Sequence, residues 1–308
     1  MHFFVPLAYA GQGAGGVTIW FVEQEPSVKD LASFIHPLLE LCNVAGEAIC
    51  SHYHKPGETE FESKGDSSPV TEADIESHHI LAEGLSQLSG NLPVLSEECT
   101  PSELRQRRDW PRFWMVDPLD GTKEFINGTG EFTINIALID DHRPLLGMLY
   151  VPLTRTGYVG IPGEGATLYQ RTEDGLWAQQ SITGRALEAD KPLTVLASRR
   201  HSGPRLHRCL DWLQAQRGEF ARDNSGSALK FCQLAAGEGD FYPRFSPCSE
   251  WDVAAGQALV EAAGGAVVGM DGQPLRYNCR DTLLSPNFLA IADPEADLWR
   301  SLPEGVFA

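Results

Sequence analysis

Apolar residues in the first part of the chain recur at the spacing of a helix. Residues 30–53 carry an apolar residue at every third or fourth position, which predicts an amphipathic helix. Pro37 fits the first turn of a helix that starts near Ile35, where the missing N–H is not needed. A second helix is predicted over residues 71–88. The chain therefore begins its fold with two helices.

Short apolar runs rich in β-forming residues follow these helices. Strands are predicted at residues 92–95, from residue 113, and at residues 132–139, 144–151, 157–160 and 166–169. Residues 140–142 read as the turn of a hairpin. Helices followed by antiparallel strands predict an α+β domain over residues 35–185.

A polar stretch near residues 175–191 predicts the domain boundary. Beyond it, strands and helices alternate, which predicts an α/β domain over residues 186–308. The expected strands lie at residues 193–197, 241–245 and 289–291, and the expected helices at residues 224–236 and 250–264.

Residues 1–34 stand apart from both domains. The first 22 positions contain no charged side chain apart from His2, and Ala8-Tyr9-Ala10 resembles a signal-peptidase site. A signal peptide should also have a basic start and a longer apolar core. We therefore interpret residues 1–34 as an extension of unknown role or a mis-set start.

The length, composition and net charge of the chain limit the classes of function that it can have. A chain of 308 residues with 42% hydrophobic content can form two ordinary domains. Its 42 acidic and 24 basic residues give a net charge of −18, which argues against nucleic-acid polymers and anionic membranes as general partners. The 7 cysteines form no C-x-x-C pair, which favours free thiols in a reducing cytoplasm. No apolar run approaches the roughly 20 residues of a membrane span.

Candidate chemistry concentrates in residues 114–125. An apolar run is expected to end at Asp117, and Asp120 follows just before Gly121. Two carboxylates so close repel each other unless a cation or a proton lies between them. Oxygen ligands at a strand end suit Mg²⁺. The alternative is an ordinary Asp-Pro turn.

Other acidic residues fall at similar places. Glu97 follows a predicted strand, Asp252 lies in the first turn of a predicted helix, and Asp74 stands three residues after Thr71. Their alternatives are a solvated turn, a helix-dipole contact and a capping box. Without Cys or His ligand sets, the acidic residues together predict a site for several Mg²⁺ ions rather than zinc.

Groups that can bind anions occur in the second half. Ser198 and His201 close its first predicted strand, and Arg244 ends a later one. Gly226 and Lys230 lie in a Ser- and Gly-rich segment expected to open a helix, whose free N–H groups attract anions. A plain helix cap is the alternative for that segment.

The motifs resemble a known family. D-P-L-D-G-T at residues 117–122, Glu97-Glu98 upstream and residues 251–256 downstream resemble the inositol monophosphatase superfamily of Mg²⁺-dependent, lithium-sensitive phosphomonoesterases. The resemblance covers residues 35–292 and implies the layered αβαβα sandwich of the sugar phosphatase fold.

Three segments resemble one subgroup of this superfamily. Residues 117–125, G-S-A-L-K-F at residues 226–231, and Tyr242-Pro243-Arg244-Phe245 resemble the CysQ-type 3'(2'),5'-bisphosphate nucleotidases. Inositol monophosphatases more often have T-N where this chain has Lys123-Glu124.

The resemblance implies roles for individual residues. One Mg²⁺ would be held by Glu97, Asp117 and the Leu119 carbonyl, and a second by Asp117, Asp120 and Asp252, with Glu97 also near a third, weaker ion. Asp74 and Thr122 would activate water, with Glu97 as the third catalytic residue. The scissile phosphate would meet the N–H groups of Gly121 and Thr122, close to Asp252. The nucleotide and its 5'-phosphate would be bound by Ser198, His201, Gly226, Lys230 and Arg244.

The expected reaction is Mg²⁺-dependent hydrolysis of adenosine 3',5'-bisphosphate to AMP and phosphate, inhibited by Li⁺. The alternatives are an inositol monophosphatase or related sugar phosphatase, and a non-catalytic sensor of a phosphorylated ligand. The resemblance further implies a monomer or homodimer in the cytoplasm, with peripheral contact to the cytoplasmic membrane face.

Overall fold

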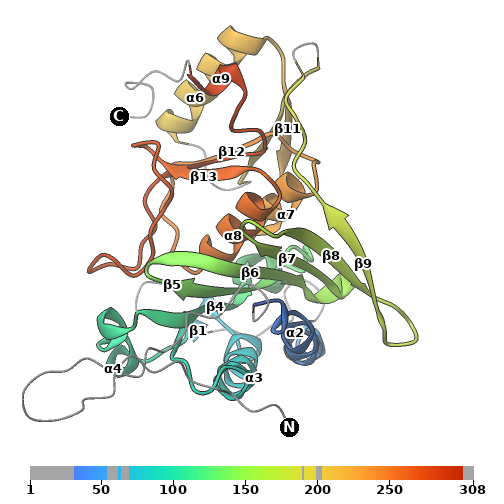
Figure 1. Ribbon diagram of the computed structural model, residues 1–308, viewed down its shortest axis with the longest axis vertical. Helices are drawn as coiled ribbons and strands as arrows, with labels where there is room; N and C mark the ends of the chain where they lie inside the picture. Colours follow the sequence, from blue (N-terminus) through green and yellow to red (C-terminus); the bar gives the residue numbers. More distant parts are fainter. Residues whose placement is uncertain (1–30, 54–61, 64–68, 189–190, 199–202, 301–308) are drawn as a thin grey trace, which may run out of the picture.

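The elements stack in five layers (Figure 1). The computed structural model describes residues 31–53, 62–63, 69–188, 191–198 and 203–300. Helices α2 and α3 cover one face of a 7-stranded sheet, and α7 and α8 lie between this sheet and a 5-stranded sheet. Helices α6 and α9 lie beyond the second sheet. This order confirms the predicted αβαβα sandwich.

The N-terminal half contains two long helices and most of the strands. Its elements are α2 (Ile35–Ser51), β1 (Glu62–Ser63), β2 (Pro69–Val70), α3 (Glu72–Leu88), β3 (Val94–Ser96), α4 (Pro101–Leu104), a 3₁₀ turn (Arg107–Asp109), β4 (Arg112–Asp120), α5 (Thr122–Ile126), β5 (Thr133–Asp140), β6 (Arg143–Val151), a second 3₁₀ turn (Pro152–Thr154), β7 (Thr156–Ile161), β8 (Gly165–Arg171) and β9 (Trp177–Ile182).

Strand β4 explains the apolar run seen in the sequence. The sheet runs in the order β3-β4-β5-β6-β7-β8-β9, and only the β3–β4 pair in it is parallel. Phe113 and Met115 of β4 pack in the core that contains α8, whereas Trp114 and Val116 pack against α2 and α3. Because both faces are covered, the strand is apolar at consecutive positions.

The C-terminal half alternates strands and helices, as predicted. Its elements are β10 (Thr194–Ala197), α6 (Pro204–Arg217), β11 (Ala221–Asn224), α7 (Leu229–Ala235), β12 (Phe241–Arg244), α8 (Ala254–Ala262), β13 (Ala266–Gly269), β14 (Phe288–Ile291) and α9 (Asp297–Arg300). The sheet order is β11-β10-β12-β14-β13, with β10 parallel to both of its neighbours.

The small residues of α8 allow this helix to lie close to the first sheet and to α7. A Cβ atom added at Gly147 of β6 would lie 2.3 Å from the carbonyl oxygen of Ala255, and one added at Gly256 would lie 2.3 Å from the ring of Phe231. Neither position can accept a larger side chain without movement of a neighbour. The close packing holds α8, and the turn before it, between the two halves.

The limits of several predicted helices and strands differ from those in the structure, and one strand was not predicted. The polar stretch after residue 175 contains β9, whose residues are mostly exposed because it is the edge strand of the first sheet. The strand expected to end at Asp117 continues to Asp120. The helix expected from residue 224 begins at Leu229, because residues 221–224 pair with β10. The helix expected to include Asp252 begins at Ala254.

The predicted extension lies mostly outside the described residues, which begin at residue 31. Among the described residues, no helix has both the length and the apolar composition needed to cross a membrane.

Candidate metal and phosphate site

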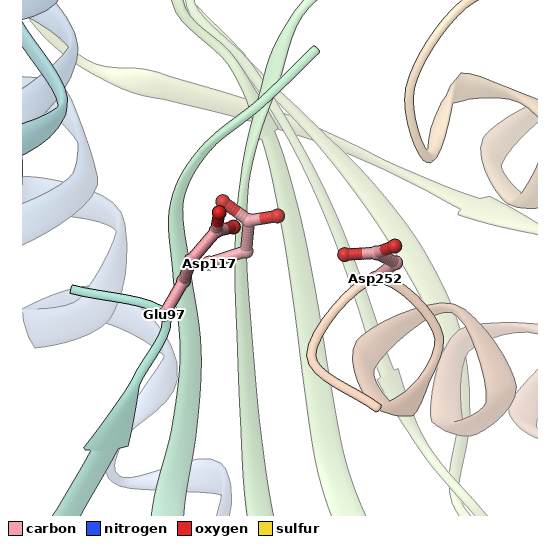
Figure 2. A group of neighbouring side chains, drawn as sticks. All are labelled: Glu97, Asp117 and Asp252. Carbon is pink, nitrogen blue, oxygen red and sulfur yellow. The ribbon is translucent and has the colours of Figure 1, made fainter. Parts of the chain in front are cut away.

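Three acidic side chains from distant parts of the chain meet at one place. Glu97, Asp117 and Asp252 each have a carboxylate oxygen within 4.8 Å of an oxygen of the others. Figure 2 shows Asp252 on the turn that leads into α8, with its carboxylate pointing toward Glu97 and Asp117. The structure therefore brings together predicted residues from both halves.

Parallel pairing of β3 and β4 brings Glu97 to Asp117. Ser96 lies opposite Val116, and the Glu97 N–H donates to the Val116 carbonyl over 3.1 Å. The residue after each of these partners is therefore one of the two acids. Carboxyl ends of neighbouring parallel strands are a common place for ligand-binding groups.

A bulge in β4 places the second carboxylate of the motif. Asp117 pairs with Asn135 but Asp120 pairs with Thr133, so β4 has one extra residue here. Pro118 lies in this bulge, where a residue without a backbone N–H is tolerated because the regular hydrogen bonds between the strands are interrupted. Oδ1 of Asp117 accepts from the Leu119 N–H over 3.1 Å. The turn chemistry considered as an alternative is thus present inside the site and shapes it.

Asp117 is buried and Asp120 and Asp252 are half-buried, and the loss of water around their carboxylates disfavours the charged forms. Burial, followed by the charges of neighbouring carboxylates, raises the pKa of Asp117 and Asp252 well above the usual range. Burial raises the pKa of Asp120 to about 6, although Lys230 and the side chain of Asn135 lower it. Several buried oxygen ligands that repel one another suit a hard divalent cation. The donor set therefore fits Mg²⁺.

Asp74 serves both as a helix cap and as part of the site. Its Oδ2 accepts from the N–H and the hydroxyl of Thr71, over 2.8 and 2.7 Å. Its Oδ1 accepts from the Thr122 hydroxyl over 3.2 Å. The same hydroxyl lies 3.2 Å from the Leu119 carbonyl oxygen. The predicted pair of Asp74 and Thr122 is thus in contact beside the carbonyl predicted to bind metal.

Gly121 lies where no other residue fits without strain. Its φ is +95°, and an added Cβ would lie 2.7 Å from the Glu131 carbonyl oxygen. This glycine directs the chain from β4 into α5, a helix of 5 residues that begins at Thr122. Such a turn lets backbone N–H groups face a bound anion.

A cavity of about 210 Å³ lies beside the carboxylates and contains most of the predicted substrate-binding residues. Its lining includes Asp120, Gly121, Lys123, Glu124, Ser198, Gly226, Ser227, Lys230, Arg244 and Asp252. Both halves contribute, so residues more than a hundred positions apart line one space. Of the other two predicted contacts, Thr122 is not part of this lining, and His201 lies outside the described residues.

Two of these groups are already engaged, which corrects the picture of free anion-binding groups. The Gly226 N–H donates to Oε2 of Glu131 over 3.0 Å. Nζ of Lys230 donates to the carbonyl oxygens of Ser225, Gly226 and Ser227, over 2.9, 3.3 and 2.6 Å. Burial lowers the pKa of Lys230 to about 8. Lys230 thus holds the loop before α7 as well as lining the cavity.

Arg244 is also partly engaged. Its Nε donates to the Ser246 carbonyl over 3.1 Å, and one Nη donates to the Pro247 carbonyl over 3.2 Å. A guanidinium has five N–H donors, so these two bonds leave donor capacity toward the cavity. Arg244 therefore fits the predicted role of an anion contact.

Some residues at the site were not predicted. Ser227 has a φ of +43°, and its buried Oγ has no hydrogen-bond partner among the described residues. A second cavity, of about 360 Å³, shares Ser198, Tyr242 and Arg244 with the first and is also lined by Arg205 and Arg208. Arginines three positions apart at the start of a helix were a readable signal for this basic surface.

Comparison with known proteins identifies a family for this chain. The inositol monophosphatase family model matches residues 30–300. The chain belongs to the inositol monophosphatase family. The predicted superfamily is therefore confirmed.

Two bacterial relatives narrow the position within this family. The 3'(2'),5'-bisphosphate nucleotidase CysQ of Salmonella typhimurium is 42% identical over 255 residues, which cover 82% of this chain and 98% of that protein. CysQ of Escherichia coli K12 is 43% identical over 250 residues, which cover 81% of this chain and 96% of the relative. The chain thus resembles CysQ-type proteins over nearly their whole length.

Solved structures agree with the layered fold. CysQ from Bacteroides thetaiotaomicron, at 37% identity, aligns with a TM-score of 0.73 and covers 85% of this chain and 98% of its own. The extragenic suppressor protein SuhB from Bartonella henselae, at 23% identity, aligns with a TM-score of 0.69 over 89% of this chain and 99% of its own. The second likeness supports the fold alone.

Proposed function

We propose that this protein is a Mg²⁺-dependent 3'(2'),5'-bisphosphate nucleotidase that hydrolyses adenosine 3',5'-bisphosphate to AMP and phosphate. The supporting observation is the meeting of Glu97, Asp117 and Asp252 beside a cavity lined by Lys230 and Arg244. Carboxylates that bind metal next to cationic side chains suit a substrate with two separate phosphates. The identity to CysQ-type relatives supports the same substrate class.

The metal ligands would divide into two groups that share Asp117. Glu97, Asp117 and the Leu119 carbonyl would hold one ion, and Asp117, Asp120 and Asp252 the other. Glu97 would also be near a third, weaker ion. Bound Mg²⁺ supplies a lowered pKa for water and charge stabilisation for the entering and leaving oxygens.

Asp74 and Thr122 would move the proton of the attacking water. The Thr122 hydroxyl already donates to Oδ1 of Asp74. As the water attacks phosphorus, Thr122 Oγ1 accepts a proton from it and passes its own proton to Asp74. Glu97 would help orient this water. The N–H groups of Gly121 and Thr122 would hold the phosphate in line for attack.

The cationic cavity lining explains how a protein with a net charge of −18 could bind a polyanion. Arg244, Lys230 and Ser198 would bind the nucleotide near the carboxylates, with Gly226 shaping the wall. The second cavity adds Arg205 and Arg208 further from the carboxylates. Guanidinium groups match phosphate geometry, so this cavity suits the 5' end of the nucleotide.

Phosphate release from several substrates tests this proposal. Adenosine 3',5'-bisphosphate, AMP and inositol 1-phosphate are compared with and without Mg²⁺, and with added Li⁺. We expect Mg²⁺-dependent, Li⁺-inhibited turnover of the bisphosphate and little of the others. Faster turnover of inositol 1-phosphate would favour the sugar phosphatase alternative. Binding of the bisphosphate without any turnover would favour a sensor.

The finer features of the protein stay predictions. These are the state as monomer or homodimer, the cytoplasmic location and the peripheral contact with a membrane.

A further inference from the structure

A buried polar network lies just behind the metal site. Glu250 is 0% exposed, and its carboxylate accepts from the Asn278 N–H over 2.6 Å and from an Nη of Arg280 over 2.8 Å. A buried carboxylate is stable only when it is paired and hydrogen bonded. We call Glu250, Asn278, Arg280 and Arg107 the Glu250 network.

Arg107 connects this network to the N-terminal half. Its guanidinium donates to Oδ1 of Asn278 and to the carbonyl oxygens of Arg280 and Asp281, the last two over 2.9 and 2.7 Å. The Asn278 side-chain amide donates back to the Arg107 carbonyl. Arg107 is 6% exposed and Asn278 is 1% exposed, so these bonds are shielded from water.

The same network holds the turn that carries Asp252. The Glu250 N–H donates to the Leu283 carbonyl over 2.8 Å, and the Ala254 N–H donates to the Glu250 carbonyl over 3.0 Å. Within the turn, the Ser249 N–H donates to Oδ2 of Asp252 over 2.9 Å. A shift of Glu250 would therefore move the Asp252 carboxylate.

The position of Asp252 is important because the proposed metal ligands come from both halves of the chain. Asp252 comes from the C-terminal half, whereas Glu97, just after β3, and Asp117 and Asp120 of β4 come from the N-terminal half. We propose that the Glu250 network positions Asp252 against the other carboxylates, so that divalent-metal affinity depends on Glu250 and Arg280. This role rests on the proposed metal site and makes Glu250 a positioning residue rather than a catalytic one.

Two substitutions disrupt the network and one serves as a matched control. Glu250→Gln keeps the volume and an acceptor for Asn278 but removes the charge that faces Arg280. Arg280→Met removes the cation and leaves the side chain nearly as long. Arg108→Gln is the control, because Arg108 also bonds to this loop, at the Cys279 carbonyl and Asp281, and none of its hydrogen bonds among the described residues reaches Glu250.

Titration calorimetry of the full-length protein with Mn²⁺, without nucleotide, gives the deciding readout. Residues that orient metal ligands typically change metal affinity by about 10- to 100-fold. We expect at least about tenfold weaker Mn²⁺ binding in both network variants and no more than about twofold in the control. Because no substrate is present, the result does not depend on which phosphate ester the protein hydrolyses.

Measurements of activity and of folding serve as controls for the calorimetry. The Mg²⁺ concentration for half-maximal turnover should rise with the Mn²⁺ dissociation constant, while Arg280→Lys should recover most of the affinity. Circular dichroism without metal checks each fold. If Glu250→Gln does not fold, Arg280→Met decides, since its side chain is partly at the surface. Wild-type Mn²⁺ affinity in the folded network variants would overturn the proposal.

Discussion

Asp120 should destabilise the metal-free protein, because its carboxylate is buried among other acids. Its pKa rises from a usual 3.8 to about 6, mainly through burial. Asp120→Asn keeps the shape and an oxygen that can accept from Asn135, but it carries no charge. We therefore expect the metal-free variant to be more stable than the wild type at neutral pH.

The size and the sign of this stability difference follow from the different proton affinities of Asp120 in the folded and unfolded states. Above pH 6 the wild type must ionise a group whose pKa is about two units higher in the folded than in the unfolded state, which costs on the order of 3 kcal/mol. The penalty grows as pH rises from about 4 to 6 and stays constant above that range. At pH 4 the group is protonated in the folded state and only about half ionised in the unfolded state, so the difference should fall below about 1 kcal/mol.

Urea unfolding followed by circular dichroism, at pH 8 and pH 4 with a chelator, measures this difference. Mg²⁺ at about 1,000 times its Kd for the wild type should then reverse the order at pH 8, since it stabilises the wild type by about 4.1 kcal/mol and the variant has lost a ligand. Equal or greater stability of the metal-free wild type at pH 8 would refute the reasoning.

Three further substitutions test other parts of the site. Thr122→Val should lower kcat by about 10²- to 10³-fold, since it breaks the path from water to Asp74; steady-state kinetics check this, and unchanged Mn²⁺ binding shows that the metal site is intact. Gly121→Ala should lower the free energy of unfolding by roughly 1 to 3 kcal/mol more than Gly272→Ala does. Gly272 is the control because it also has a positive φ but has open space around it. Urea unfolding compares the two variants, and equal losses of stability would contradict the close contact at Gly121. Arg205→Gln should raise KM for adenosine 3',5'-bisphosphate about tenfold, the value of one charge-assisted hydrogen bond, and an unchanged KM would remove the second cavity from substrate binding.

The sequence was sufficient to predict the acidic part of the site. Glu97 and Asp117 each follow a run of apolar residues that predicts a strand, and strand ends are a common place for ligand-binding groups. The bulge between Asp117 and Asp120 was not predictable, because it depends on the pairing of β4 with β5. The turn and metal-site interpretations of these residues are compatible, because the hydrogen bond from the Leu119 N–H to Asp117 lies within the acidic cluster.

The anion-binding part was harder to predict, because tertiary contacts decide which groups are engaged. Ser and Gly before Lys230 resemble an open helix N-terminus, but Glu131 from a distant loop takes the Gly226 N–H. Lys230 turns back onto its own loop. Strand β9 was missed because an exposed edge strand carries few apolar residues. The Gly226 contact depends on a residue 95 positions away, whereas Lys230 bonds to carbonyls of its own loop.

Identification of the reaction product tests the central claim most directly. Purified protein is incubated with adenosine 3',5'-bisphosphate and Mg²⁺, and the nucleotide is separated by chromatography, with Asp117→Asn as the inactive control. We predict AMP that carries the 5'-phosphate, with one phosphate released per AMP formed and none formed without Mg²⁺ or by Asp117→Asn. Adenosine 3'-phosphate as the product, or equal activity of Asp117→Asn, would contradict the account.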